Sequence, residues 1–306
     1  MKILIAGSSG AIGQPLLNLL KPLEHDVYAI TQSEAKLKSI ESKGATPLIL
    51  NVLDREAVFS AVDRIKPDVV IDMLTHLPKE YTPEAMRESA AMNAKLRIEG
   101  GGHLLAAAEK SGVRRFIAQS AAFWYAPGPG PADENTSFAF DATPGIASGS
   151  RTYAEIERRT LESGKIEGVA LRFGFFYGPG TWFHPGGNVA DQILKQQFPI
   201  IGDGQGIWNF VHIEDAASTI AASFLSPPGA YNIVNDSPSP MNTWLPAFAR
   251  FLGAAPPSSI TEEEGLKTRG PDAVYYATKL RAATNAKAKQ LLHFKPRPFE
   301  WLDAGR

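Results

Sequence analysis

The sequence predicts an α/β protein: a doubly wound parallel sheet with a smaller, mainly C-terminal α/β domain. Two observations support this prediction. Short apolar segments alternate with helical patterns through the first half of the 306 residues, an order typical of a parallel sheet with crossover helices. The first apolar segment, residues 2–6, also leads directly into a glycine-rich turn and then into a leucine-rich helical pattern, which is the setting of a nucleotide-binding turn.

The glycine-rich turn at residues 7–13 predicts where a dinucleotide binds. Gly7 permits a tight turn, Gly10 lets the backbone approach a pyrophosphate, and Gly13 lets the helix pack closely on the strand. The N-terminus of the following helix offers free N–H groups and the positive end of its dipole to the phosphates. The alternative is a turn without a ligand, but its position between strand and helix favours nucleotide binding.

The end of the second predicted strand, residues 27–30, indicates which nucleotide binds. In NAD enzymes an acid near this point usually holds the adenosine ribose hydroxyls, whereas residues 31–33 of this chain include no acid. Thr31, Ser33 and either Lys36 or Lys38 are suited to a 2′-phosphate instead, so we expect NADP slightly in preference to NAD. The alternative is that these residues only cap and solvate the next helix.

The remaining strands of the sheet follow in sequence. They are predicted at residues 47–50, 68–73, 116–120 and 169–173. Asp54 is a good N-cap for a helix over residues 55–65. Leu74 and Thr75 come directly after a strand, where the ligands of parallel sheets lie.

Two segments between these strands are unusual. A long helical pattern over residues 84–111 contains three successive glycines, 100–102. Because glycine destabilises a helix, we expect another backbone to pack closely there. Residues 121–150 lack periodicity and are rich in Pro, Gly, Ala and Ser, so a long functional loop is predicted, followed by a helix over residues 152–163.

The chain is predicted to form two domains. Residues 1–173 form the nucleotide-binding domain and include the loop 121–150. Residues 174–306 form mainly the substrate-binding domain, with 207–226 returning to the core of the first. Residues 254–275 are polar and contain proline, so we expect them to be mobile.

Composition excludes several classes of function. The formal net charge is −1 and no long basic run is present, which argues against nucleic acid as a partner. The chain has no cysteine, so disulfides, thiolate metal sites and a cysteine nucleophile are excluded, and no metal site is predicted. With no signal peptide ahead of the first strand and no membrane-spanning run, we expect a cytoplasmic protein without a membrane partner.

Five segments, taken with their order and spacing, resemble the extended branch of the short-chain dehydrogenase/reductase superfamily, the NAD(P)-dependent epimerase/dehydratase-like enzymes. They are spread over nearly the whole chain, at 7–13, 115–120, 171–180, 210–215 and 231–234. The resemblance implies a Rossmann-type domain, a small-molecule substrate and a homodimer. It also implies cofactor contacts from Gly7, Ser9, Gly10, Ala11, Ile12, Gly13, Thr31, Ser33, Asp54, Leu74, Thr75, Gln119 and Phe173, where Asp54 either contacts the adenine or only caps its helix.

The family's chemistry uses a Tyr, a Lys four residues later, and a Ser or Thr after the fifth strand. A cation one helical turn from the Tyr favours the phenolate, and the hydroxyl polarises the substrate oxygen. This chain has Tyr153, but Glu157 replaces the Lys and Ala121 replaces the hydroxyl residue. Ser120 comes one residue early, so its side chain is expected to point the other way. The sequence therefore resembles an atypical member of the family.

The candidate site residues follow from this comparison. Tyr153 is the first candidate for the proton donor, and the other catalytic candidates are Ser120 and Tyr177. The candidate substrate contacts are Tyr125, Trp182, His184 and Arg172. Structural alternatives are turn packing for Tyr177, helix capping for His212, and pairing with an acid for Arg172.

Together these features predict an NAD(P)-dependent oxidoreductase or epimerase-like enzyme with an atypical active site. It would act on a small carbonyl or sugar-nucleotide-like substrate by hydride transfer, with the hydride supplied by the cofactor. The incomplete Tyr-Lys-Ser set leaves two alternatives open. One is a cofactor-binding sensor or interaction protein without turnover, and the other is a non-redox lyase on the same fold.

Overall fold

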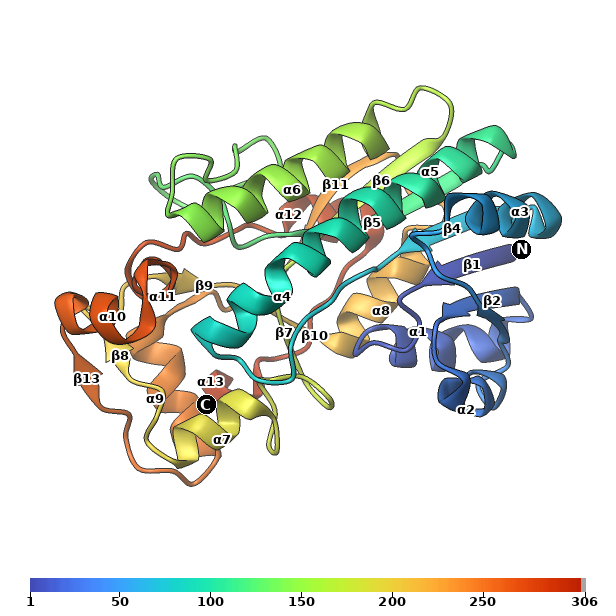
Figure 1. Cartoon of the computed structure of the whole chain (residues 1–306). Helices are drawn as coiled ribbons and strands as arrows, with labels where there is room; N and C mark the ends of the chain where they lie inside the picture. Colours follow the sequence, from blue (N-terminus) through green and yellow to red (C-terminus); the bar gives the residue numbers. More distant parts are fainter. Residues whose placement is uncertain (304–306) are drawn as a thin grey trace.

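The computed structural model describes residues 1–303, built around one large sheet (Figure 1). Its seven strands lie in the order β11-β6-β5-β4-β1-β2-β3, and all of its pairings are parallel. The predicted doubly wound sheet is therefore confirmed. The strands are β1 (Lys2–Ala6), β2 (Asp26–Thr31), β3 (Thr46–Ile49), β4 (Val69–Asp72), β5 (Arg115–Ala121), β6 (Glu167–Phe173) and β11 (Gly229–Ile233).

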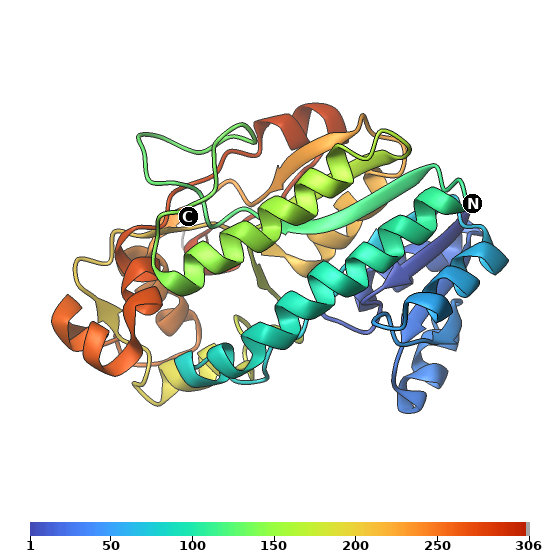
Figure 2. The same cartoon turned by 45° about the horizontal axis from the view of Figure 1, so that its top comes forward.

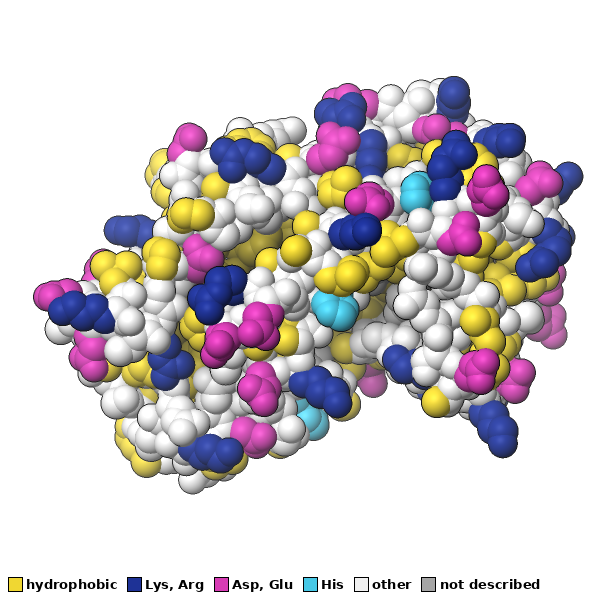
Figure 3. All heavy atoms as spheres, viewed as in Figure 1, with side chains coloured by type: hydrophobic (Ala, Val, Ile, Leu, Met, Phe, Trp, Pro, Cys, Tyr) yellow, Lys and Arg dark blue, Asp and Glu magenta, His cyan; other side chains and the backbone are white. Residues whose placement is uncertain are grey.

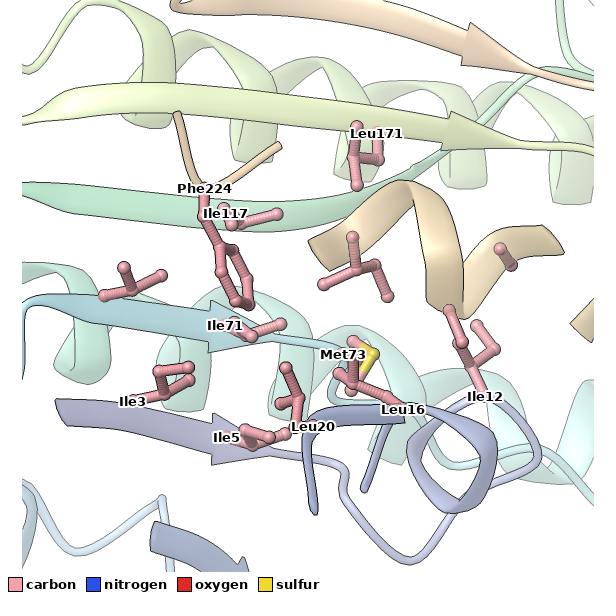
Figure 4. Close-up of a cluster of buried hydrophobic side chains, with 14 of the residues drawn as sticks. Ile3, Ile5, Ile12, Leu16, Leu20, Ile71, Met73, Ile117, Leu171 and Phe224 are labelled. Atoms are coloured by element: carbon pink, nitrogen blue, oxygen red, sulfur yellow. The ribbon is translucent and has the colours of Figure 1, made fainter. Parts of the chain in front are cut away.

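Helices cover both faces of the sheet because successive residues of each strand point to opposite faces. One face packs against α1 (Gly13–Leu20), α8 (Ile213–Ala222) and α12 (Ala286–Leu292). The other packs against α3 (Arg55–Ile65), α5 (Gly101–Lys110) and α6 (Pro144–Leu161). Figure 4 shows Ile5, Ile71 and Ile117 of the first face meeting Leu16 of α1 and Phe224. Strand β11 lies in the sheet itself, and α12 packs on its first face. Segments beyond residues 207–226 therefore also return to the sheet.

The predicted long helix is present and contains a π-helical turn. It consists of α4 (Pro83–Lys95), the π-helical η3 (Leu96–Gly100) and α5, and it runs beside α6 (Figure 2). A Cβ on Gly101 would lie 2.3 Å from Asp72 Oδ2 and 2.7 Å from Arg159 Nη2, and one on Gly100 would lie 2.8 Å from Val52 Cγ2. Side chains of neighbouring elements therefore occupy the space beside these glycines. The expected close approach of another backbone is not found there.

Replacing Gly101 by Ala is expected to lower the free energy of unfolding by about 2 kcal/mol, because the new methyl group overlaps Asp72 and Arg159 in a packed interior. The overlap itself costs about 3 kcal/mol, and a gain of about 1 kcal/mol in helix propensity offsets part of that cost. Gly102→Ala is the matched control, since its Cβ would meet only the end of the Arg159 side chain, at 3.2 Å. Urea unfolding measures both, and equal stability of the two variants would contradict the close approach at Gly101.

Helices occupy part of the predicted loop 121–150 and part of residues 254–275. The helix α6 begins at Pro144 and not at residue 152, with the proline in its first turn, a favourable position for that residue; the loop therefore ends at residue 143. Within 254–275, α10 (Glu262–Arg269) begins after Thr261, whose hydroxyl accepts a hydrogen bond from the Glu264 N–H. The next helix, α11 (Pro271–Thr278), starts with proline. The prediction of a loop was therefore wrong over residues 144–150.

The second half of the chain packs around an aromatic core. Its largest buried side chains include Phe183, Trp208, Phe210, Trp244 and Phe248. The elements around this core are β7 (Phe175–Tyr177), α7 (Asn188–Leu194), β8 (Ile200–Ile201), β9 (Ile207–Trp208), β10 (Phe210–His212), β12 (Ser239–Pro240), α9 (Met241–Phe251), β13 (Ser259–Ile260) and α13 (Glu300–Asp303). None of the helices in the described part of the chain has the length and apolarity to cross a membrane.

Candidate active site

The glycine turn lies at the carboxyl end of β1, and its shape fits a pyrophosphate. Gly7 has φ +89°, and a Cβ there would lie 2.5 Å from the Met73 carbonyl oxygen. A Cβ on Gly13 would lie 2.3 Å from the Ser8 carbonyl oxygen. On Gly10, which is exposed, a Cβ would approach only the Gly7 carbonyl oxygen, at 3.3 Å. An added methyl group at Gly10 would therefore take up the free space beside the turn and the N-terminus of α1, where an anion binds favourably.

A lysine lies directly beside this turn. Lys36 Nζ donates a hydrogen bond to Ser9 Oγ at 3.0 Å. Thr31 is buried at the end of β2, and its Oγ1 accepts from the Ser33 N–H at 3.1 Å. Of the residues predicted to hold the 2′-phosphate, Lys36 therefore lies against Ser9 of the glycine turn, while the Thr31 hydroxyl binds the backbone of its own turn.

The other predicted cofactor residues follow the carboxyl ends of strands or lie on them. Asp54 caps α3, because its Oδ1 accepts from the Ala57 N–H at 3.0 Å. The N–H of Leu74 donates to a carboxylate oxygen of Asp72 at 3.0 Å, and Thr75 donates to the amide oxygen of residue 93 at 3.1 Å. Ile12 is buried under the turn beside Ala11, Phe173 is buried at the end of β6, and Gln119 is half-buried on β5.

Glu157, at the family's Lys position, belongs to a buried ion pair. Arg172 Nε lies 2.7 Å from Glu157 Oε1 and Arg172 Nη2 lies 2.6 Å from Oε2, the bidentate geometry that is strongest for such pairs. Both side chains are 7% exposed. Ser120 Oγ also donates to Glu157 Oε1, so the Ser120 hydroxyl is bound to the residue at the family's Lys position. Burial alone would lower the pKa of Arg172, but its bonds to Glu157 raise that pKa above its usual value.

Tyr125 extends this buried cluster toward the edge of the sheet. Its hydroxyl donates to Asn232 Oδ1 and accepts from Arg172 Nη1, the latter at 3.0 Å. Burial raises the pKa of Tyr125 to about 12, although Arg172 acts in the opposite direction. Arg172 and Tyr125 therefore join β6, β11 and the loop after β5. Neither lines the cavity described below, so Arg172 follows its structural alternative and not the predicted role as a substrate contact.

A cavity of about 530 Å³ opens between α4, α6 and α11, and Figure 3 shows a hollow with hydrophobic side chains between α4 and α6. Tyr153, the first candidate for the proton donor, lines it. The Trp124 ring lies 5.5 Å from the Tyr153 ring, and its Nε1 donates to Tyr276 Oη at 2.8 Å. A Cβ on Gly149 would lie 2.1 Å from Trp124 Cζ3. The absence of a side chain at Gly149 therefore lets the Trp124 indole pack directly on α6. The result is a rigid aromatic wall.

Four other residues singled out from the sequence lie outside this cavity. Tyr177 is 1% exposed and packs 5.5 Å from the Trp301 ring. Trp182 Nε1 donates to the carbonyl oxygen of residue 79 at 3.0 Å, and His184 Nδ1 lies 2.8 Å from the carbonyl oxygen of the next residue. His212 caps α8 by accepting from the N–H of residue 214, and its pKa is lowered by burial and then by a nearby arginine. Tyr177 and His212 thus take up their structural alternatives.

The π-helical turn places a residue that the sequence reasoning missed, Arg97, in the cavity wall. Arg97 is 4% exposed, and its guanidinium lies 4.9 Å from the centroid of the Tyr153 ring. Within residues 1–303, its Nε has no hydrogen-bond partner. Arg159 of α6 donates to the carbonyl oxygens of Arg97 and Ile98, at 2.5 and 2.6 Å, and so holds the turn in place. A basic residue ahead of three glycines in a helix is the signal that points to it.

The region around Arg97 carries more positive than negative charge. Asp72 is a buried acid whose Oδ1 accepts from the Leu74 N–H. Burial raises the pKa of Asp72, and the Leu74 N–H, Arg159 and Arg97 partly offset that rise. Burial also lowers the pKa of Arg159. Among residues 1–303, no group of three or more His, Asp or Glu side chains is placed to hold a metal ion.

Comparison with known proteins connects this geometry to a family. The sequence model of the NAD dependent epimerase/dehydratase family matches residues 3–233. A curated relative, the 3-diazoavenalumate denitrifying reductase of Streptomyces sp, is 36% identical over 308 residues, which cover 99% of this chain and 98% of the relative.

Solved structures share the fold. The UDP-glucose 4-epimerase of Thermotoga maritima, solved with UDP-glucose, is 19% identical with a TM-score of 0.73, covering 99% of this chain and 96% of that one. A dTDP-glucose 4,6-dehydratase of Streptomyces venezuelae, solved with NAD bound, is 17% identical with a TM-score of 0.74, covering 100% of this chain and 98% of that one. The protein described here belongs to the NAD dependent epimerase/dehydratase family, whose members are nicotinamide-dependent oxidoreductases, epimerases and dehydratases.

Proposed function

We propose that this protein is an NADPH-dependent reductase that acts on a small diazo compound, with replacement of the diazo group by hydrogen. The observation that carries the proposal is the cluster of Glu157, Arg172 and Ser120, which occupies the family's Lys position and the end of strand β5 with a buried ion pair. The name of the relative at 36% identity, a denitrifying reductase of a diazo compound, supports the same chemistry.

NADPH is the cofactor that the nucleotide end of the site favours. The glycine turn and the N-terminus of α1 fit its pyrophosphate, and Lys36 beside Ser9 supplies a cation for the 2′-phosphate. No acid is present at residues 31–33 to repel that phosphate. Solved structures with the same fold contain NAD, which lacks only this group. When bound, the dinucleotide supplies a hydride.

A diazo substrate explains why the proton-transfer residues are incomplete. Reduction of a carbonyl requires a proton for its oxygen, and the family meets that need with the Tyr-Lys pair. An arenediazonium cation requires none: a hydride is added, the carbon–nitrogen bond breaks, and dinitrogen leaves with the electron pair of that bond. The positive charge is neutralised and no proton enters or leaves. In such a reaction Tyr153, Trp124 and Tyr276 act as walls that hold the ring of the substrate.

Replacing Tyr153 by Phe tests this assignment. With 4-carboxybenzenediazonium and NADPH, we expect the variant to keep the wild-type rate within about threefold, because its hydroxyl transfers no proton. A general acid, by contrast, contributes about 10²- to 10⁴-fold. The assay follows NADPH at 340 nm together with benzoate formation, and the reaction without protein is subtracted. A loss of about a hundredfold would contradict the proposal.

A second candidate function is reduction or epimerisation of a carbonyl or sugar-nucleotide substrate, with Tyr153 as the proton donor. It is favoured by the position of Tyr153 in the cavity wall, where the structure describes no hydrogen bond from its hydroxyl to any of residues 1–303. Wild-type turnover of a carbonyl substrate that is abolished in Tyr153→Phe would establish this candidate. The same pair of proteins therefore separates the two functions.

A further inference from the structure

We propose that Arg97 binds a carboxylate of the substrate, so that the cavity accepts a planar aromatic acid. The inference rests on the proposed function in one respect, that this cavity is the substrate site. It concerns binding and not hydride transfer, so that it can be tested without turnover.

Among the described charged residues of the cavity, Arg97 is the buried cation without an acceptor. Arg87, Arg97, Arg269 and a single acid, Asp272, line it, so the cavity carries an excess of positive charge. Arg269 donates to a backbone carbonyl oxygen, Asp272 accepts from a threonine hydroxyl, and Arg87 is exposed. Arg97 is 4% exposed, and within residues 1–303 its guanidinium forms no hydrogen bond or ion pair.

A buried guanidinium without an acceptor is costly, because burial removes its hydration without replacing it. The buried acid Asp72 interacts with Arg97 only through its charge, and one of its oxygens already accepts from the Leu74 N–H. A carboxylate from a ligand would satisfy Arg97 with two parallel hydrogen bonds in the plane of the guanidinium.

The Arg97 guanidinium lies over the Tyr153 ring. Its Cζ is 4.9 Å from the ring centroid, a favourable cation–π distance. Hydrogen bonds lie in the plane of a guanidinium, so this stacking does not use the donors that a carboxylate needs. Because Arg159 binds the carbonyl oxygens of residues 97 and 98, the turn that carries Arg97 is held as well.

The rest of the cavity suits a flat apolar ring. Tyr81, Trp124, Phe198, Trp208 and Tyr276 are among its lining residues, and Trp124 is tied to Tyr276 by a hydrogen bond. A cavity of about 530 Å³ is in the usual range for a small-molecule ligand, and an apolar lining with a few placed polar groups is the usual pattern. An aromatic ring with one carboxylate matches both the aromatic walls and the buried, unpaired guanidinium of Arg97.

Titration calorimetry with 4-hydroxycinnamate and its methyl ester tests this inference. We expect the wild-type protein to bind the acid at least about tenfold more tightly than the ester, since hydrogen bonds to a charged group are worth about 1.5–3 kcal/mol, or about 10- to 150-fold. In Arg97→Met this preference should disappear, and Arg97→Lys should retain a few-fold preference because it keeps the charge but not the bidentate geometry. Lys95→Met is the matched control, since Lys95 is exposed on the same helix and should leave the preference unchanged.

Equal affinity of the wild type for acid and ester, or no binding of the acid, would overturn the inference. NADPH affinity, measured separately, shows whether Arg97→Met is folded, and Arg97→Lys provides the test if it is not. If the acid binds through Arg97 but no diazo compound is reduced, then the carboxylate site stands and the proposed reductase function fails. If diazo compounds are reduced without any acid preference, then only the carboxylate site fails.

Discussion

Replacing Glu157 by Lys, which would restore the family's pattern, is expected to lower the free energy of unfolding by about 3–5 kcal/mol. The variant would place an ammonium group beside Arg172 in a buried space where both side chains are now 7% exposed. It would also remove the acceptor of the Ser120 hydroxyl. Urea denaturation followed by circular dichroism measures this loss directly.

Glu155→Lys on the same helix is the matched control. Glu155 pairs with Arg158 on the surface, where its side chain is 43% exposed, so its replacement should cost no more than about 1 kcal/mol. The double variant Glu157→Met with Arg172→Met should recover most of the stability, since replacing both partners of a buried pair by apolar side chains is often nearly neutral. A stable Glu157→Lys protein with new carbonyl reductase activity would contradict the structural role of Glu157.

Replacing Lys36 by Glu is expected to raise the dissociation constant for NADPH about a hundredfold while changing that for NADH only a few-fold. A phosphate monoester carries nearly two negative charges at neutral pH, and Lys36 lies where its ammonium reaches Ser9 of the glycine turn. Losing a charge-assisted hydrogen bond costs about 1.5–3 kcal/mol, and a carboxylate in its place adds repulsion. Fluorescence titration with both reduced dinucleotides measures the change.

Lys43→Glu is the control for this second prediction. Lys43 is half-buried in the same part of the chain, and its Nζ donates to Asn18 Oδ1 at 2.8 Å, away from the turn. It should leave the affinity for NADPH within about twofold, a change of less than about 0.5 kcal/mol. If wild-type protein binds NADH as tightly as NADPH, and Lys36→Glu weakens both equally, then the assignment of the 2′-phosphate to Lys36 is wrong.

The sheet could be predicted because its signals are local. The glycine turn and the apolar segments indicate β1, α1 and the parallel sheet with its crossover helices, and the structure confirms this fold class. The start of α6 could not be predicted, since Gly145 and Gly149 make residues 144–150 look unfavourable for a helix. Tertiary contacts explain these two glycines. A Cβ on Gly145 would lie 1.9 Å from Asp272 Oδ2, and one on Gly149 would lie 2.1 Å from Trp124 Cζ3. The homodimer, the domain boundaries and the cytoplasmic location stay predictions.

The site was predicted in part. The departures from the family's pattern at Ala121 and Glu157 were visible in the sequence, whereas the hydrogen bond of Ser120 to Glu157 was not. The pairing of Glu157 with Arg172 depends on the contact of α6 with β6, which no local pattern reveals. Arg97 was missed because a π-helical turn changes the face on which a helical residue lies, so helical periodicity alone does not place it in the cavity.

The most direct test of the proposed reduction is isotope transfer from NADPH deuterated at C4 to 4-carboxybenzenediazonium, with product analysis by mass spectrometry. The account predicts that one of the two deuterated epimers of NADPH gives benzoate with one deuterium at the carbon that carried nitrogen. One dinitrogen would be released and one NADPH oxidised per benzoate, and unlabelled NADPH in D₂O would give no deuterium there. Release of dinitrogen with hydrogen taken from the solvent, or without oxidation of NADPH, would contradict hydride delivery by this protein.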